Sequence, residues 1–172
     1  LPFESDEEFP QSAVSRGKLY RQSGRVGQGM GFADGSLELD CANMEDGYSV
    51  IFWIRGDQSL AQGAGIAVAG GVSCCRANTE PGFRIEIGEN FVRAMACGQT
   101  REKPCRLDLT CPGDLVGKWN HVAFAVDPKA GHMCLRVNFG KAYYYGFPKD
   151  MAMLSAGKIY IGQDAALDPA NR

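Results

Sequence analysis

The sequence predicts an all-β fold in which two antiparallel sheets pack face to face. Short segments along the chain alternate apolar and polar residues, which is the period of a strand with one buried face. The chain also contains 22 Gly and 8 Pro among 172 residues, as expected where many turns join short strands. This length fits a single domain, residues 1–172, which can bury a core without a metal or a disulfide.

The first forty residues contain short candidate strands. Residues 1–29 are rich in Ser, Gly and Arg and give a weak strand signal, at residues 1–3 and around residues 18–20. A turn at residues 31–35, Gly-Phe-Ala-Asp-Gly, leads into a strand at residues 36–40, in which leucines alternate with polar residues. The domain is therefore defined more firmly from residue 30 onward than before it.

The segment from residue 48 to residue 55 is apolar on both sides. Its side chains form two alternating sets, which are Tyr48, Val50, Phe52 and Ile54 on one face and Ile51 and Trp53 on the other. A strand that is apolar on both sides is usually covered on both sides. We therefore expect one face to meet the opposite sheet, and the other to lie under a loop or in a concave groove. On this argument Trp53 fits a core better than a ligand platform.

The middle of the chain contains a Gly-rich segment and a hairpin. Residues 63–71 include a predicted short strand at residues 66–69, but no Lys-Ser or Lys-Thr follows, as a phosphate-binding loop requires, so we expect no nucleotide site. Residues 82–97 predict two strands that turn at Gly88-Glu89-Asn90. Residues 97–112 are predicted to be a loop held by cysteines, in which two leucines add a short strand.

The strongest strand signal is a hairpin at residues 118–142. Apolar residues alternate along both of its strands, at Val122, Phe124 and Val126 and then at Met133, Leu135 and Val137. Residues 127–131, Asp-Pro-Lys-Ala-Gly, have turn chemistry because proline presets φ and glycine accepts positive φ. His121 alternates with the apolar set, so we expect it to point away from the core.

Tyrosines follow this hairpin and are candidate ligand-binding residues. A strand would place Tyr143 and Tyr145 on one face and Tyr144 on the other. Aromatic rings stack on the apolar faces of sugars, so these three residues and Trp53 are the candidates for glycan contact. Ordinary packing of rings between strands is the commoner alternative. A last strand is predicted at residues 158–162.

Motifs at three places, in order along the chain, carry a resemblance to a known family. The segment Gly47 to Arg55 contains a Phe-Trp pair, and Ile159-Tyr160-Ile161-Gly162 is a strand that ends in Ile-Gly. The hairpin supplies the remaining matches, which are Trp119, His121, Val122, Ala123, Asp127, Gly131, Leu135, Val137, Asn138, Gly140 and Lys141. Over residues 30–164 the chain resembles laminin-G-like domains of the concanavalin A-like jelly-roll group. Phe139, inserted into the usual Asn-Gly pair, and Ala33 depart from the family pattern.

The resemblance implies a two-sheet antiparallel jelly-roll sandwich that binds glycan or protein without catalysis. It also implies calcium at a rim of loops, for which the available residues are Asp34, Asp127, Asn138 and Asp164, although such residues also serve as turn formers. Members usually continue beyond the Ile-Gly strand into one more strand, which pairs near the N-terminal one. This chain stops at Arg172 without it, so we expect that it is a fragment or that a second polypeptide supplies the strand.

Cysteine is abundant in the chain. The seven residues are Cys41, Cys74, Cys75, Cys97, Cys105, Cys111 and Cys134, a density that suits an oxidising compartment. Three disulfides would leave one thiol to pair outside the chain, and the neighbours Cys74 and Cys75 would have different partners. Buried reduced thiols are the alternative. Zinc is disfavoured because the chain has no Cys-x-x-Cys motif and only two His.

Charge and motif content exclude several functions. The chain has 18 Lys and Arg against 20 Asp and Glu and no basic run, so nucleic acid is not an expected partner. It has no apolar run of membrane-spanning length. The nearest pair of carboxylates for glycoside hydrolysis is Glu86 and Glu89, but Glu89 falls in a turn. No Gly-x-Ser-x-Gly motif accompanies the histidines, so we predict that the protein is not an enzyme.

The function predicted from the sequence is that of an extracellular recognition or adhesion module. Its partner would be a glycan or a protein on a cell surface or in the matrix. The alternative from another class is a structural module of a larger surface assembly, joined by strand sharing and disulfides. A carbohydrate-active enzyme is a third hypothesis, and it would need two carboxylates that face each other across a groove.

Overall fold

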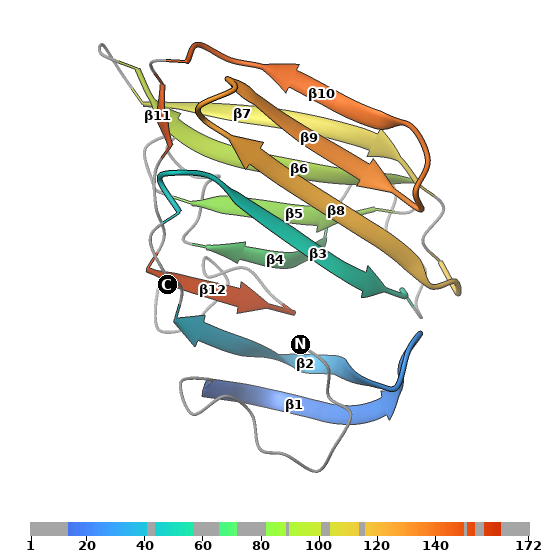
Figure 1. Cartoon of the computed structure of the whole chain (residues 1–172). Helices are drawn as coiled ribbons and strands as arrows, with labels where there is room; N and C mark the ends of the chain where they lie inside the picture. The colour runs from blue at the N-terminus through green and yellow to red at the C-terminus, as the bar shows by residue number, and fades with distance from the viewer. Residues whose placement is uncertain are drawn as a thin grey trace.

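The computed structural model describes residues 14–40, 44–56, 66–71, 82–88, 90–100, 104–113, 116–149, 151–153 and 157–162. These residues form twelve strands in two sheets and contain no helix, which confirms the all-β prediction (Figure 1). Among them, no segment forms a helix that is long and apolar enough to cross a membrane.

Sheet A contains eight strands, all paired antiparallel. They are β1 (Val14–Ser23), β2 (Gln28–Asp40), β4 (Ile66–Gly71), β5 (Phe83–Ile87), β6 (Phe91–Gln99), β7 (Pro104–Pro112), β11 (Ala152–Met153) and β12 (Lys158–Ile161). Their order is β1-β2-β12-β4-β5-β6-β11, and β7 also pairs with β6. Three of the pairs, β2 with β12, β12 with β4 and β6 with β11, join strands that are far apart in sequence, so the sheet depends in part on long-range pairing.

Sheet B contains four strands in the order β10-β9-β8-β3. Their bounds are Tyr48–Ile54 for β3, Asn120–Asp127 for β8, His132–Val137 for β9 and Ala142–Gly146 for β10. The strands β8 and β9 form the hairpin predicted at residues 118–142, and they pair from Val122 opposite Val137 to Asp127 opposite His132.

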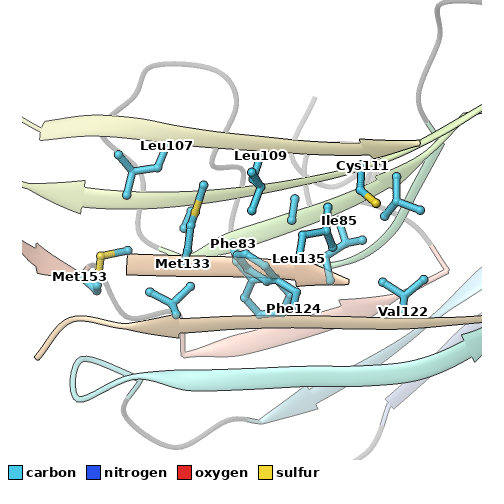
Figure 2. Packing of buried hydrophobic residues seen from close by; sticks show 14 of the residues in the cluster. Phe83, Ile85, Leu107, Leu109, Cys111, Val122, Phe124, Met133, Leu135 and Met153 are labelled. Atoms are coloured by element: carbon cyan, nitrogen blue, oxygen red, sulfur yellow. The ribbon is translucent and has the colours of Figure 1, made fainter. Parts of the chain in front are cut away.

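The core fills the space between the two sheets. Phe83 and Ile85 of β5 in sheet A face Phe124 of β8 and Leu135 of β9 in sheet B, and all four side chains are fully buried (Figure 2). The rings of Phe83 and Phe124 lie 6.5 Å apart, centroid to centroid. Burying a side chain of this size contributes about 1.5–3 kcal/mol, so the alternating apolar residues are what hold the sheets together.

Two segments differ from the sequence prediction. Residues 97–112, predicted to be a loop, continue β6 to Gln99 and return as β7, which pairs with β6 along its whole length. The reason is that Leu107, Leu109 and Cys111 alternate and face the core, so this segment buries an apolar face of its own. The turn predicted at residues 31–35 lies inside β2, where a register shift opposite Lys18 and Leu19 accommodates the extra residue.

The two sheets differ in width. At one side of the sandwich, β10 of sheet B lies against β7 of sheet A, so the two layers end together. At the other side sheet B ends at β3, whereas sheet A continues through β12, β2 and β1 (Figure 1). Sheet A therefore projects beyond the β3 edge of sheet B.

Candidate functional site

The candidate site begins with the outward face of β3. Tyr48, Val50, Phe52 and Ile54 lie on one face, as predicted, and this is the face that packs against the core. The opposite face carries Ile51 and Trp53, which are 64% and 37% exposed. The expectation that Trp53 belongs to the core is therefore wrong. Alternation assigned the two faces correctly, but it could not tell which of two apolar faces meets sheet A.

Trp53 belongs to a cluster of three rings on the outer face of sheet B. In the register of β3 and β8, Trp53 lies opposite His121, and their ring centroids are 5.2 Å apart in an edge-to-face arrangement. The ring of Phe139, which follows β9, stacks on His121 at 4.2 Å and lies 6.1 Å from Trp53. We call Trp53, His121 and Phe139 the aromatic cluster. His121 points outward, as predicted.

Phe139 projects onto this face because the turn after β9 has an unusual backbone. Asn138 and Phe139 have φ of 53° and 57°, and the Gly140 amide donates to the Val137 carbonyl at 3.0 Å. Two successive residues with positive φ are the mark of a tight hairpin turn that normally selects Gly or Asn. A non-glycine residue in this conformation stores about 1 kcal/mol of strain, and such strain is concentrated at functional positions.

Side chains from β8 and β9 hold the turn in place. The Asn138 side chain accepts a hydrogen bond from the His121 amide at 2.9 Å and donates to the Asn120 side chain at 2.6 Å. Asn120 is fully buried and in turn donates to the Lys118 carbonyl. The Arg136 guanidinium donates to the carbonyls of Gly140 and Phe139 at 2.8 and 2.6 Å. Phe139 is therefore 58% exposed on a rigid support.

The cluster lies at the cationic end of sheet B. The Arg25 guanidinium, from the turn between β1 and β2, lies 5.5 Å over the Trp53 ring. Other cations at this end are Arg55, Lys118, Arg136 and Lys141, which precede or follow the strand ends that meet there. The acidic residues Glu45, Asp46 and Asp127 lie at the opposite end of the same strands. The cluster is thus suited to an apolar surface that carries an anionic group.

One polar atom beside the cluster has no partner. Nδ1 of His121 is buried, and no hydrogen-bond partner for it occurs in the described part of the chain. An unsatisfied buried polar group costs about 1–3 kcal/mol, so natural proteins rarely keep one without a reason.

The structure places the predicted tyrosines at the far edge of sheet B. Tyr143 packs inward against the core, which agrees with ordinary ring packing, the alternative to glycan contact. Tyr144 is 66% exposed, and its ring meets His132 edge to face at 5.9 Å. Trp53 lies on β3 and Tyr144 on β10, which are the two outermost strands of the sheet. Three strand spacings, about 14 Å, separate them, so they do not form one site.

The two candidate calcium residues that the structure describes, Asp127 and Asn138, lie at opposite ends of one hairpin. Asp127 Oδ1 accepts a hydrogen bond from the Ala130 amide at 2.8 Å and so stabilises the turn between β8 and β9. Asn138 supports the other end of the same hairpin. Asp164 and the side chain of Asp34 lie outside the described residues. Within the described ranges no group of three or more His, Cys, Asp or Glu could hold a metal ion, and calcium stays a prediction.

The three described cysteine side chains lie on three different surfaces. Cys97 is disulfide-bonded, and by the alternation of β6 it points to the outer face of sheet A. Cys111 and Cys134 are free thiols, so the prediction that they are disulfide candidates is wrong. Cys111 faces the core, and Cys134 lies on the outer face of sheet B opposite Tyr144, too far from Cys97 for a disulfide. Outside the described part are Cys41, Cys74, Cys75 and the side chain of Cys105.

The carboxylate weighed for glycoside hydrolysis is held by two guanidinium groups. Glu86 is only 7% exposed, and its oxygens lie 2.7 Å from the Arg84 side chain and 3.4 Å from the Arg93 side chain. The companion residue Glu89 lies outside the described residues. Glu86 therefore forms buried ion pairs on sheet A, and this arrangement does not suggest a general acid.

Comparison with known proteins shows a β-sandwich shared with binding domains. No family model matches the chain, and no curated protein matches it. The binding domain of botulinum neurotoxin DC in complex with SialylT is similar over 90% of this chain and 39% of that chain, with 16% identity and a TM-score of 0.67. The binding domain of botulinum neurotoxin serotype C1 is similar over 87% of this chain and 37% of that one, with 15% identity and a TM-score of 0.64.

A third likeness covers most of both chains. The CBM40 of the Ruminococcus gnavus IT-sialidase, bound to alpha2,3 sialyllactose, covers 71% of this chain and 69% of that chain, with 15% identity and a TM-score of 0.53. Against the neurotoxin domains, the chain spans about two fifths of their length. Identities this low establish a shared fold, and the laminin-G-like resemblance stays a prediction.

Proposed function

We propose that this domain is a non-catalytic recognition module that binds a glycan on its aromatic cluster. The observation that carries the proposal is an exposed, pre-organised platform, in which Trp53, His121 and Phe139 lie together on a face that the described residues leave open. The C–H faces of a pyranose ring stack on such rings, and hydroxyl groups take the neighbouring polar atoms. A rigid platform loses little entropy on binding, which favours affinity.

Charge points to a glycan with an anionic group. Arg25 lies over Trp53, and Arg136 supports the turn that presents Phe139. A carboxylate or sulfate on the sugar would meet the guanidinium group of Arg25, since Arg136 already donates to the carbonyls of Gly140 and Phe139. Among the structural neighbours, one is described with alpha2,3 sialyllactose and another in terms of interaction with two ganglioside molecules. Those descriptions support the choice of sialylated glycans as first probes.

We also propose that the domain lies outside the cell or at the cell surface. Cys97 is disulfide-bonded, and disulfides persist mainly in oxidising compartments. The rival function, a structural module that shares strands with another polypeptide, has one observation in its favour. Sheet B ends at β3 with an edge that pairs with no described strand. A neighbour is described in complex with rat synaptotagmin II, so a protein partner is a second class to test.

The test is a glycan array with the purified domain, with and without calcium, followed by titration of the strongest glycan. We expect Trp53→Ala and Phe139→Ala each to weaken binding roughly 30-fold, about 2 kcal/mol, as for a central aromatic contact. Tyr144→Ala, which removes an exposed aromatic residue at the far edge of the same face, is the matched control and should change affinity less than twofold. Binding that survives both cluster substitutions, or no glycan binding at all, would overturn the proposal.

A further inference from the structure

We propose that the end of the sandwich beside the aromatic cluster binds the surface of an anionic lipid bilayer. Three segments meet at this end, which are the turn at residues 24–27 between β1 and β2, residues 117–119 before β8, and the turn at residues 138–141 between β9 and β10 (Figure 1). They meet because the end of β3 pairs with the start of β8, which lies beside the end of β9, and because Arg25 reaches Trp53. The bilayer contact goes beyond the proposed glycan binding and does not depend on it.

Two of these segments expose large apolar side chains at their tips. Val26 is 71% exposed in the turn between β1 and β2, which a backbone hydrogen bond of 2.9 Å closes. Phe139 is 58% exposed in the turn after β9. Trp53 joins the two tips, because its ring lies 5.5 Å from the Arg25 guanidinium and 6.1 Å from the Phe139 ring. Transfer of such side chains from water to the boundary between lipid headgroups and acyl chains is favourable.

Cations surround these apolar side chains and keep their charge. Arg25 lies over the Trp53 ring, and Lys141 lies 5.8 Å over the Tyr143 ring. Arg136 donates to two backbone carbonyls of the turn after β9. Rings and carbonyls hold a cation in place without neutralising it, and in the described part of the chain none of these three cations forms an ion pair. Lipid phosphates would supply the counter-charge.

The charge distribution of the domain selects this end over the rest of its surface. The formal net charge is −2, so attraction to an anionic surface requires that the two signs be separated. Glu45, Asp46 and Asp127 lie at the opposite end of the same strands, and β8, with 8 residues, keeps the two ends about 25 Å apart. Attraction extends only about 8–10 Å at physiological ionic strength, so a bilayer meets the cationic end without the acidic one.

A bilayer fits this surface better than a second copy of the domain. Two copies that met through this end would place the same cations opposite each other, and such like-charge contact is unfavourable. The exposed side chains stand on separate tips, and the boundary region of a bilayer accepts single side chains to a depth of about 5–10 Å without matching their shape. Tryptophan is enriched at this depth because its ring is amphipathic. Charge and apolar exposure therefore point to the same occupant.

The experiment measures co-sedimentation of the whole domain with vesicles that carry no glycan. The vesicles consist of phosphatidylcholine alone or of phosphatidylcholine with about one third phosphatidylglycerol, an anionic lipid. We expect binding to the anionic vesicles to be at least about tenfold stronger than to the neutral ones, and to weaken with added salt. The emission of the domain should shift to shorter wavelength on binding, and the shift should shrink in Trp53→Phe.

Substitutions at the tips test which side chains enter the bilayer. Val26→Ser and Phe139→Ser should each weaken binding to anionic vesicles about five- to tenfold, because each removes buried carbon. Lys141→Ala should weaken it about fivefold by removing one charge. Tyr144→Ser is the matched control, since it removes an exposed ring at the far edge of sheet B, and it should change vesicle binding less than about twofold.

Val26→Ser also separates this surface from the glycan site. Val26 does not belong to the aromatic cluster, so the variant should lose vesicle binding and keep its glycan affinity within about twofold. Vesicle binding by a domain that fails on the glycan array would leave this inference standing and remove the glycan proposal alone.

Several outcomes would overturn the inference. They are absence of vesicle binding, equal binding to neutral and anionic vesicles, and binding that Val26→Ser and Phe139→Ser leave unchanged. A loss in Tyr144→Ser as large as in the tip variants would also overturn it. Self-association that Val26→Ser abolishes, without vesicle binding, would assign this end to a second copy instead.

Discussion

The two edges of sheet B end in different ways. At the β10 edge Tyr143 packs inward, the following Phe147 is buried in the core, and β10 lies against β7 of the opposite sheet. At the β3 edge the inward side chains are half-buried, and Ile51 and Trp53 stand exposed on the outer face. The two edges differ mainly in what lies beside them, because β10 meets β7 and the buried Phe147, whereas β3 has no such neighbour among the described strands.

Tyr48, at the start of β3, carries a buried hydroxyl whose cost in stability can be measured. Its hydroxyl is buried and has no partner among the residues that the structure describes, and burial raises the pKa of Tyr48 well above its ordinary value of 10.0. Tyr48→Phe should raise the free energy of unfolding by about 1 kcal/mol near neutral pH. Above pH 10 the unfolded tyrosine ionises and the folded one does not, so the wild type loses up to about 1.4 kcal/mol per pH unit.

Chemical denaturation between pH 7 and pH 11 measures this effect. The variant should lack the Tyr48 part of the loss above pH 10, so its advantage over the wild type should widen there. Tyr143→Phe, on the β10 edge, is the matched control and should stay within about 0.5 kcal/mol of the wild type. An advantage that stays constant with pH would contradict the burial of the Tyr48 hydroxyl.

Phe139 tests whether the turn stores strain for the sake of recognition. Phe139→Gly relieves a positive φ of 57° and should stabilise the fold by up to about 1 kcal/mol, while it weakens glycan binding. Asn138→Gly is the matched change at a φ of 53°, but it removes the hydrogen bonds to His121 and Asn120 and should destabilise the fold by about 1–2 kcal/mol. Thermal unfolding and glycan titration of both variants check the pair.

The opposite result is informative about the turn. If Phe139→Gly destabilises the domain and leaves glycan affinity unchanged, the ring contributes to packing and the strain has no role in binding. If the turn stores strain for recognition, Phe139→Gly must raise the free energy of unfolding and lower the affinity for glycan.

Local pattern was enough to predict the hairpin of β8 and β9. Its buried residues, such as Phe124 and Leu135, alternate without interruption, and its turn is spelled out by Asp-Pro-Lys-Ala-Gly. The same logic failed for residues 97–112, where cysteines and prolines suggested a loop and the alternating leucines of β7 were underweighted. Burial of a continuous apolar face decided the structure there.

The aromatic cluster could not be predicted from local pattern because it joins three separate segments. Trp53, His121 and Phe139 meet through the pairing of β3 with β8 and the turn after β9. One signal did exist, since Phe139 interrupts an Asn-Gly pair at a position where a large ring is costly. The tyrosines at residues 143–145 attracted more attention by composition, but position in the sheet places them at the closed edge.

The most direct measurement is amide and side-chain chemical-shift mapping of the isotope-labelled domain during titration with the strongest glycan of the array. The account predicts that the largest shifts fall on the Trp53 indole N–H, the His121 ring and the Phe139 amide, and that Tyr144 and Tyr145 stay unchanged. Shifts centred on the tyrosines of β10, or on the outer face of sheet A, would contradict the claim that recognition takes place at the β3 edge of sheet B.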